Sequence, residues 1–380
     1  MTGMTGAVTG AHVRDTNLQA VYRAIRRRHP VTRAQLSRDL GMSKPTANRA
    51  IDALLAAGLV EEVPRPPDAA GYDAVYFGPR ARAATVLALD LGSRYLRGMI
   101  ADLDGEVLAR LDQPVASNEP AHVLEVALRV RDALVDTAGS LPEVATIGIG
   151  GVIDPRTGIV HDANQHALEG FAARAELTAA LALPVIVEND VNLAAVGEGW
   201  RGAGADVRDF AFLSVGSGVG AGLVLGGGLH RGVNGAAGEI DQVPPGQRFR
   251  TDSPAADAFL AHVWQHSEFA TCEDVMAAAR VRDDRALRLV AWEAERIAEH
   301  AARIVSVVDV SLIVLGGGIG LNGDLLAEPV RTFLAALSPY QPPAVETSRL
   351  GEAAILTGAV ATGLGAVLTN LVTARVSAAH

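Results

Sequence analysis

The chain has 380 residues, of which 49% are apolar and 20% are charged, and its formal net charge at neutral pH is −10. This length is sufficient for two or three domains with a sizeable buried core. The single cysteine, Cys272, excludes an internal disulfide and any zinc site built from several cysteines. We expect a cytoplasmic protein without a membrane-spanning segment, because a span needs roughly 18 predominantly apolar residues and the chain start lacks the pattern of a signal peptide.

The charge is distributed unevenly along the chain. Residues 1–62 hold nine Lys or Arg residues and five Asp or Glu residues, a net charge of +4, so the remaining residues carry −14. A small basic module is therefore joined to a large acidic body. This division indicates nucleic-acid binding by the first part only.

Residues 1–15 are expected to form a disordered lead-in to a domain that spans residues 16–79. Within this domain, apolar residues recur at helical spacing from Leu18 to Ile25 and predict a first helix that ends before Pro30. The lead-in shows no such spacing. We therefore place the start of the folded domain close to Leu18.

Two further helices follow, and each has a residue suited to cap its beginning. Thr32 precedes a short helix that ends at Gly41, where the missing side chain permits a tight turn. Ser43 precedes the next helix, whose first turn tolerates Pro45. A helix, a glycine turn and a second helix form the order that groove recognition in DNA requires.

The third helix pairs an apolar stripe with a polar face that can bond both phosphates and base edges. The residues that we expect to contact DNA are Ser43, Lys44, Thr46, Asn48 and Arg49. Two strand-like segments, 58–63 and 73–77, bracket a proline-rich tip and predict a winged helix-turn-helix. The alternative is a bundle that only packs or dimerises, but the basic charge, the caps and the glycine turn all favour DNA binding.

Residues 80–380 are expected to form a two-lobed α/β body, with lobes at about 80–195 and 196–380. Segments 84–115 and 208–235 resemble each other, since both show three strands separated by turns of small residues. Further helical and strand segments follow each of them. An internal duplication of this kind places a cleft between the halves, and ligands collect there at the carboxyl ends of strands.

Four stretches of the body are similar to motifs of the ROK family (repressors, open reading frames, kinases). They are GIGGVIDPRTGIVHDANQ at 148–165, VIVENDVNLAAVGE at 185–198, LSVGSGVGAGLVLGGGLHRGVNGAAGEI at 213–240 and IVLGGGIGLNGDLL at 313–326. The resemblance implies an actin-like, sugar-kinase-like fold. Together with the winged helix it implies the transcriptional-repressor branch, which includes xylose and N-acetylglucosamine repressors.

The resemblance also implies a carbohydrate site in the cleft. Sugar hydroxyls are bound by several convergent donors and acceptors, and Asp190 matches the position of the catalytic base in the kinases of the family. The residues that we expect to bind the sugar are Asn164, Asn189, Asp190, Glu239 and Gln242.

The nucleotide side departs from the family pattern at its first phosphate loop. Family kinases resemble Asp-x-Gly-Gly-Thr-Lys there, whereas this chain has Asp90-Leu-Gly-Ser-Arg94-Tyr95. We expect Arg94 to crowd the phosphates, so that the glycine turns persist as structure and no nucleotide cofactor is needed. The vestigial nucleotide site then comprises Asp90, Gly92, Gly216, Gly218, Gly220, Gly316, Gly317 and Gly318.

The family's zinc-binding segment is also altered. The resemblance implies a histidine two residues after the isoleucine of Gly-Glu-Ile and then a cysteine cluster, but this chain continues Ile240-Asp-Gln242 and has no cysteine before Cys272. We therefore expect no structural zinc. His262 and His266 lie one helical turn apart, but no third ligand for a metal is evident.

These observations favour a sugar-responsive transcriptional regulator, and the resemblance indicates a repressor, rather than an enzyme. Its expected partners are operator DNA, a carbohydrate or sugar derivative, and further copies of itself in a homodimer or homotetramer. One alternative is an ATP-dependent sugar kinase with an accessory DNA-binding module, in which Asp190 is catalytic. A second alternative is a body that only dimerises.

Overall fold

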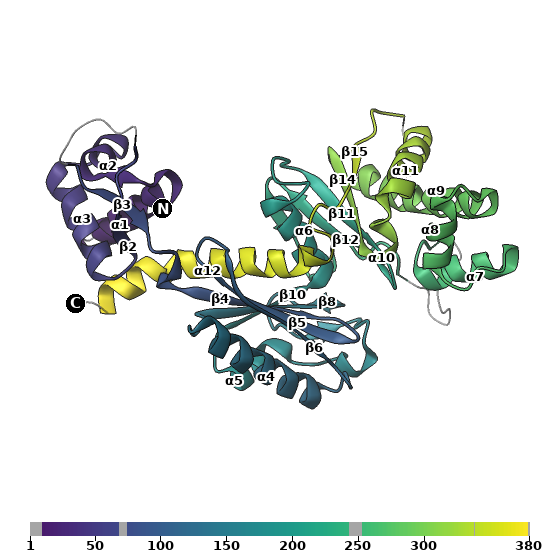
Figure 1. The fold of residues 1–380 in the computed structure, drawn as a ribbon, viewed down its shortest axis with the longest axis horizontal. Helices are drawn as coiled ribbons and strands as arrows, with labels where there is room; N and C mark the ends of the chain where they lie inside the picture. The colour runs from purple at the N-terminus through teal and green to yellow at the C-terminus, as the bar shows by residue number, and fades with distance from the viewer. Residues whose placement is uncertain (1–9, 68–73, 243–252, 338, 379–380) are drawn as a thin grey trace, which may run out of the picture.

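The computed structural model describes residues 10–67, 74–242, 253–337 and 339–378. A winged helix domain lies at one end of the molecule, the first α/β lobe lies in the middle and the second forms the other end (Figure 1). A long C-terminal helix runs from between the lobes to the winged helix domain. The expected fold class is confirmed by this arrangement.

The winged helix domain is built as its capping residues predict. Its elements are α1 (Gly10–Arg28), β1 (Val31–Thr32), α2 (Arg33–Asp39), α3 (Lys44–Ala56), β2 (Val60–Val63) and β3 (Tyr76–Pro79). The Thr32 hydroxyl accepts a hydrogen bond from the Gln35 backbone N–H, and the Gln35 side-chain oxygen accepts one from the Thr32 backbone N–H, which completes a capping box. The Ser43 hydroxyl caps α3 in the same manner, and Gly41 has φ +62° in the turn between the helices.

The first helix begins earlier than the sequence predicted. It starts at Gly10, so residues 10–15 of the expected lead-in are helical, while residues 1–9 lie outside the described part of the chain. The prediction rested on apolar spacing, which begins only at Leu18. The strand expected at 73–77 is β3, which begins at Tyr76.

The first lobe contains β4 (Thr85–Leu91), β5 (Tyr95–Asp102), β6 (Val107–Pro114), α4 (Pro120–Ala138), β7 (Val144–Ile149), β8 (Val152–Ile153), β9 (Val160–His161), α5 (Ala173–Leu181) and β10 (Val185–Asn189). Its main sheet has the order β6-β5-β4-β7-β10. The hairpin of β4 and β5 is antiparallel, whereas β7 and β10 join in parallel. Helices α4 and α5 cover one face of this sheet (Figure 1).

The second lobe repeats this topology. It contains β11 (Phe210–Val215), β12 (Val219–Leu225), β13 (Gly228–His230), α7 (Ala256–His266), α8 (Cys272–Arg280), α9 (Asp284–Val307), β14 (Leu312–Gly316), α10 (Gly317–Gly320), α11 (Gly323–Leu337) and β15 (Ala344–Thr347). Its sheet has the order β13-β12-β11-β14-β15, in the same sense as the first. The predicted internal duplication is therefore confirmed.

Two helices fill the space between the two sheets. Helix α6 (Asp190–Arg201) packs against β11 and β12, and α12 (Ala354–Ala378) packs against β4, β7 and α6. The expected lobe boundary at 195/196 falls inside α6. Helix α12, expected in the second lobe, lies on the sheet of the first.

The two interlobe helices cross in direct backbone contact at a pair of glycines. A Cβ atom placed on Gly358 would lie 1.8 Å from the carbonyl oxygen of Leu193, and one on Gly197 would lie 2.3 Å from the carbonyl oxygen of Ala354. No side chain fits at either position. Glycine therefore sets the distance between α6 and α12.

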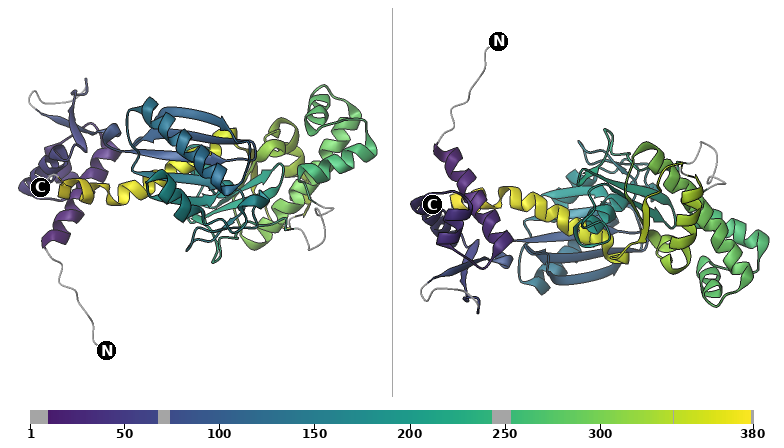
Figure 2. Two further views of the ribbon diagram at one scale, coloured as in Figure 1. Left: turned by 90° about the horizontal axis from the view of Figure 1, so that it is seen from below. Right: turned by 90° about the horizontal axis from the view of Figure 1, so that it is seen from above.

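Helix α12 corrects the expectation that the chain holds no apolar segment long enough for a membrane. Residues Gly351–Ala378 include an 18-residue window with a mean hydropathy of 1.7, and they meet the length and composition of a span. In the fold, the first half of α12 is buried between the lobes, and its end packs against α1 and α3 (Figure 2). Burial by protein on both sides accounts for this composition, as in other core helices.

A buried carboxyl group on α9 predicts a pH effect on stability. Glu293 is fully buried, and neither of its carboxylate oxygens has a hydrogen-bond partner among the described residues. Burial raises the pKa of Glu293 well above its ordinary value of 4.5. The native state therefore keeps a proton that the unfolded chain releases, so rising pH lowers the free energy of unfolding.

We expect Glu293→Gln to match the wild type in acid and to be more stable at pH 8. A single group of this kind changes the free energy of unfolding by at most about 1.4 kcal/mol per pH unit. Urea unfolding at several pH values measures the slope. The exposed neighbour serves as the control, because Glu295→Gln should keep the slope of the wild type. Equal slopes for Glu293→Gln and the wild type would contradict this assignment.

Candidate functional site

The polar face of α3 is available to a macromolecular partner. Lys44, Asn48 and Arg49 are exposed along it, whereas the hydroxyl groups of Ser43 and Thr46 bond each other at 2.8 Å as part of the helix cap. The sequence analysis assigned DNA contact to Ser43 and Thr46 as well as to Lys44, Asn48 and Arg49. In the structure, Ser43 and Thr46 form the cap of α3. Residues 68–73 of the wing lie outside the described part of the chain.

An arginine of α2 fixes the orientation of this face. Arg33 donates to the Asn48 carbonyl oxygen at 3.2 Å and to the Asp52 carboxylate at 2.6 Å, and its guanidinium lies 5.0 Å from the centre of the Phe77 ring. The side chain thus joins α2, α3 and β3. Such bracing keeps the face of α3 in one position relative to the wing strands.

The cleft between the lobes gathers most of the predicted sugar-binding residues around a cavity of about 190 Å³. Asn164 comes from the loop after β9, Asp190 begins α6, and Glu239 follows β13. The cavity also contains residues of both glycine turns: Gly216, Gly218, Gly220, Gly317 and Gly318. Gln242 does not line this cavity and is exposed.

Asn189 lines the cavity, but its side chain is already bonded. Its Nδ2 donates to the carbonyl oxygen of Gly151 at 3.0 Å, and its Oδ1 accepts from the amide of Asn192 at 2.9 Å. Asn189 therefore caps α6 and ties this helix to the turn between β7 and β8. The structure assigns it a supporting position.

Two neighbouring carboxylates, Asp162 and Asp190, act on Glu239. Burial raises the pKa of Glu239, and Asp162 and Asp190 add to the increase. Burial also raises the pKa of Asp190, although the backbone N–H of Val191 offsets part of that effect. Convergent carboxyl groups of this kind provide hydrogen-bond acceptors for hydroxyl groups.

An ion pair between a buried glutamate and a partly exposed arginine joins the two lobes. Glu188 of β10 bonds Arg231, which follows β13, and the other Glu188 oxygen accepts from the Asn192 side chain at 3.0 Å. This pair joins segments that are far apart in the sequence. No sequence signal indicated it.

A second cavity, of about 230 Å³, adjoins the first and shares Asp190, Gly317 and Gly318 with it. Asp90 and Arg97 line it from β4 and β5, and the Arg97 guanidinium lies 3.3 Å from the Asp90 carboxylate. Burial and then Asp190 raise the pKa of Asp90 to about 6, although Arg97 opposes this shift.

The residues of the expected nucleotide site separate into two groups. Gly92 and Gly316 line neither cavity, and a Cβ atom on Gly316 would lie 2.1 Å from the Phe212 ring. Gly316 is thus required for packing. Arg94 is exposed and lines neither cavity, whereas Arg97 lies in the second, so the expected crowding of phosphates by Arg94 stays a prediction.

A divalent metal ion, which phosphoryl transfer generally uses, does not fit these residues. The carboxylate that would bind it, Asp90, is paired with the Arg97 guanidinium. Among the residues that the structure describes, no group of three or more His, Cys, Asp or Glu side chains is arranged to hold a metal. His262 and His266 stack at 4.1 Å instead of facing a common point.

The altered segment after Glu239 is held at both ends by hydrogen bonds. The Ser253 hydroxyl donates to Asp241 at 2.5 Å, and the fully buried His300 lies 3.1 Å from the other Asp241 oxygen. These contacts tie the segment to α9. Residues 243–252, between the two ends, lie outside the described part of the chain.

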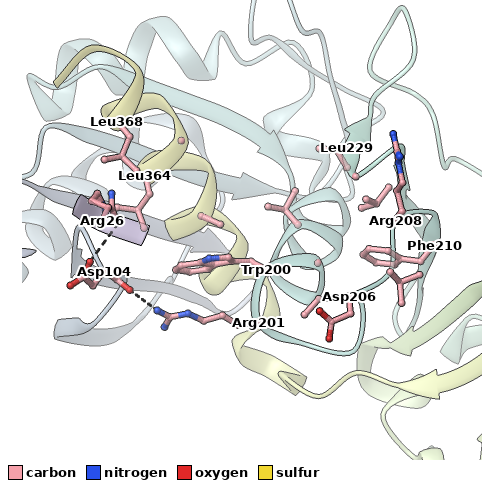
Figure 3. A pocket seen from close by; sticks show the side chains of 18 of the residues that line it. Arg26, Asp104, Trp200, Arg201, Asp206, Arg208, Phe210, Leu229, Leu364 and Leu368 are labelled. Atoms are coloured by element: carbon pink, nitrogen blue, oxygen red, sulfur yellow. Dashed lines mark hydrogen bonds and ion pairs between the residues drawn. The ribbon is translucent and has the colours of Figure 1, made fainter. Parts of the chain in front are cut away.

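A larger concavity, of about 810 Å³, lies where the winged helix domain meets the lobes (Figure 3). Arg26 of α1 donates to the Leu103 carbonyl oxygen at 2.6 Å, and Arg201 of α6 donates to the Asp104 carbonyl oxygen at 2.5 Å. Both arginines thus bond the turn between β5 and β6. Trp200 stacks on Arg201 at 4.1 Å, and Leu364 and Leu368 of α12 complete the wall.

Comparison with known proteins covers both parts of the chain. Residues 86–364 match the model of the ROK family, and residues 23–70 match that of the MarR family. A xylose repressor of Caldicellulosiruptor bescii is 24% identical, over 87% of this chain and 91% of that protein. An N-acetylmannosamine kinase of Citrobacter koseri is 31% identical, over 71% of this chain and 93% of that protein.

Among solved structures, a regulator resembles this chain over nearly its whole length, whereas an enzyme resembles only part of it. A ROK family transcriptional regulator, a homologue of the E. coli protein MLC, has a TM-score of 0.80 at 23% identity and covers 96% of this chain and 99% of its own. A ROK hexokinase of Thermus thermophilus has a TM-score of 0.63 at 27% identity and covers 74% of this chain and 99% of its own. The regulator thus matches nearly the whole chain, and the enzyme about three quarters of it.

Proposed function

The chain belongs to the ROK family, and we propose that it is a sugar-responsive transcriptional repressor whose body has lost phosphoryl transfer. The observation that carries this proposal is α12, which begins beside the cleft and ends in the core of the winged helix domain. Ala354 and Ile355 line the second cavity, whereas Leu371 and Val376 share a buried cluster with residues of α1 and α3. The sensing and DNA-binding parts thus share one rigid element.

A second connection runs through α6. This helix begins at Asp190 in the cleft and ends at Arg201, which bonds the turn between β5 and β6. Arg26 of the winged helix domain bonds the same turn. A shift of α6 on closure of the cleft is therefore transmitted to α1.

The chemistry of the cleft supports a carbohydrate or sugar derivative as the effector. Asn164, Asp190 and Glu239 supply amide and carboxyl groups around one small cavity. The effector can change DNA affinity only to the extent that it binds one arrangement of the lobes more tightly than the other. We expect a homodimer or homotetramer in the cytoplasm, since a single recognition helix reads too few bases for specific binding.

A thermal-shift screen with sugars, aminosugars and their phosphates, with and without ATP and magnesium, tests the proposal. We expect stabilisation by one sugar class and no response to ATP. Operator duplexes selected from a random pool should then be released by that sugar. Stabilisation without release would contradict the role as a sugar-responsive repressor, and silence from every compound would favour a body that only dimerises.

The sugar kinase is the second candidate, because Asp190 lies beside the glycine turns in the cleft. A kinase requires ADP formation with at least one hexose, and Asp190→Asn must abolish it. We expect no ADP formation above background. The test is run on the full chain with magnesium present.

The exposed face of α3 gives a prediction for DNA binding. Arg49→Ala and Lys44→Ala should each weaken operator binding by about 1–3 kcal/mol, because each removes a charged donor from the interface. Lys44→Ala should also reduce the salt dependence by about one counterion if Lys44 contacts a phosphate. Fluorescence anisotropy at several salt concentrations measures both effects. Arg129→Ala, an exposed change on α4, is the control, and unchanged affinity in both test variants would mean that another element contacts DNA.

A further inference from the structure

We propose that Arg97 is a built-in cation that takes the place of a divalent metal ion in the cleft. The inference rests on the proposed function, because it explains how a kinase fold acts only as a sensor. Arg97 comes from β5, in the first lobe, and lines the cavity beside Asp190 and Gly318.

The position of Arg97 follows from strand pairing. Arg97 lies directly opposite Asp90 on β4 and directly opposite Asp112 on β6. Cross-strand partners in these positions project from the same face of the sheet. The three side chains thus form one row, which we call the Asp90–Arg97–Asp112 row.

This row runs from the cavity toward solvent. The side chain of Asp90 is 4% exposed, that of Arg97 is 28% exposed and that of Asp112 is 43% exposed. The guanidinium lies 3.3 Å from Asp90 and 3.9 Å from Asp112, and it also lies 6.0 Å from the centre of the Tyr95 ring. Contacts on several sides hold the cation at the cavity wall.

The charges around the cavity explain why a cation is needed there. Asp90 is buried and Asp190 is partly buried at the wall of this small cavity, and Glu352 lies at the same cavity. Two carboxylates so close together are unfavourable without a positive charge between or beside them. In the described part of the cavity lining, Arg97 supplies that charge.

A guanidinium and a divalent ion exclude each other at this site. Magnesium and manganese require carboxylate oxygens at short range, and Asp90 already accepts the hydrogen bond of Arg97. The guanidinium also repels a second cation in the same small cavity. A bound metal ion can dissociate, whereas Arg97 is covalently part of the chain and always occupies its place beside Asp90. The cavity therefore lacks the metal that would neutralise a transferred phosphoryl group.

Removal of Arg97 should create a metal site. The probe is manganese alone, measured by electron paramagnetic resonance and by titration calorimetry on the full chain. We expect at least about tenfold tighter Mn²⁺ binding by Arg97→Ala than by the wild type, because two carboxylates then lack their cation. Adding Asp90→Asn to Arg97→Ala should abolish the gain. The control Arg94→Ala removes an exposed arginine from the same hairpin and should bind Mn²⁺ as the wild type does.

The comparison also includes Arg97→Met, which keeps most of the side-chain volume. If truncation to alanine prevents folding, the methionine variant decides the result. Equal Mn²⁺ affinity of the wild type and the folded variant would overturn the proposal, as would a gain that persists with Asp90→Asn. Operator binding is measured on the same preparations. Failure of the wild type to bind DNA would count against the proposed repressor, but it would leave the manganese result as a separate test of Arg97.

Discussion

Replacement of Gly358 by alanine should destabilise the protein by about 3 kcal/mol or more, or prevent its folding. The added Cβ would lie 1.8 Å from the Leu193 carbonyl oxygen, which belongs to the backbone of α6. A side chain can rotate away from such a contact, but a helix backbone cannot. Helix α12 would have to move away from α6, and both lobes depend on that contact.

A second glycine of the same helix is the matched control. A Cβ on Gly365 would meet no atom within 4 Å, so Gly365→Ala should stabilise the protein by about 0.5–1 kcal/mol through its helix propensity. Urea unfolding of both variants provides the measurement. Similar stabilities for the two variants would show that the α6–α12 crossing is not close-packed.

Replacement of Glu239 by glutamine should weaken effector binding by about 10- to 100-fold. The change keeps the shape of the side chain and removes a charged acceptor from a partly buried position, and hydrogen bonds to charged groups contribute about 1.5–3 kcal/mol. Calorimetry with the sugar identified in the thermal-shift screen measures the affinity. Operator binding in the absence of sugar should stay unchanged, because Glu239 is remote from α3.

Glu176→Gln on α5 is the control for this prediction, since it removes an exposed carboxylate of the first lobe and should leave effector affinity unchanged. The concentration of sugar that releases the operator should rise in proportion to the loss of affinity for Glu239→Gln. Wild-type affinity in the Glu239 variant would place the effector outside this cavity.

Local signals in the sequence predicted much of the fold correctly. Capping by Thr32 and Ser43 depends on residues only three positions away, and the turn at Gly41 depends on one residue. The repeated order of strands and turns in the two lobes is also local. The pairing of Arg97 with Asp90 is local too, because the two residues face each other across the short β4–β5 hairpin.

What the sequence by itself determined was therefore the helices and strands of the winged helix domain, the three-stranded segment repeated in the two lobes, the two-part organisation and most residues of the cleft. Only the tertiary structure decided that α12 passes between the lobes into the winged helix domain, because the polar residues of this helix gather on no single face that would show which surfaces it contacts. It also decided that Asn189 caps a helix and that Gln242 is exposed. These outcomes depend on contacts between segments far apart in the chain, which no local pattern records.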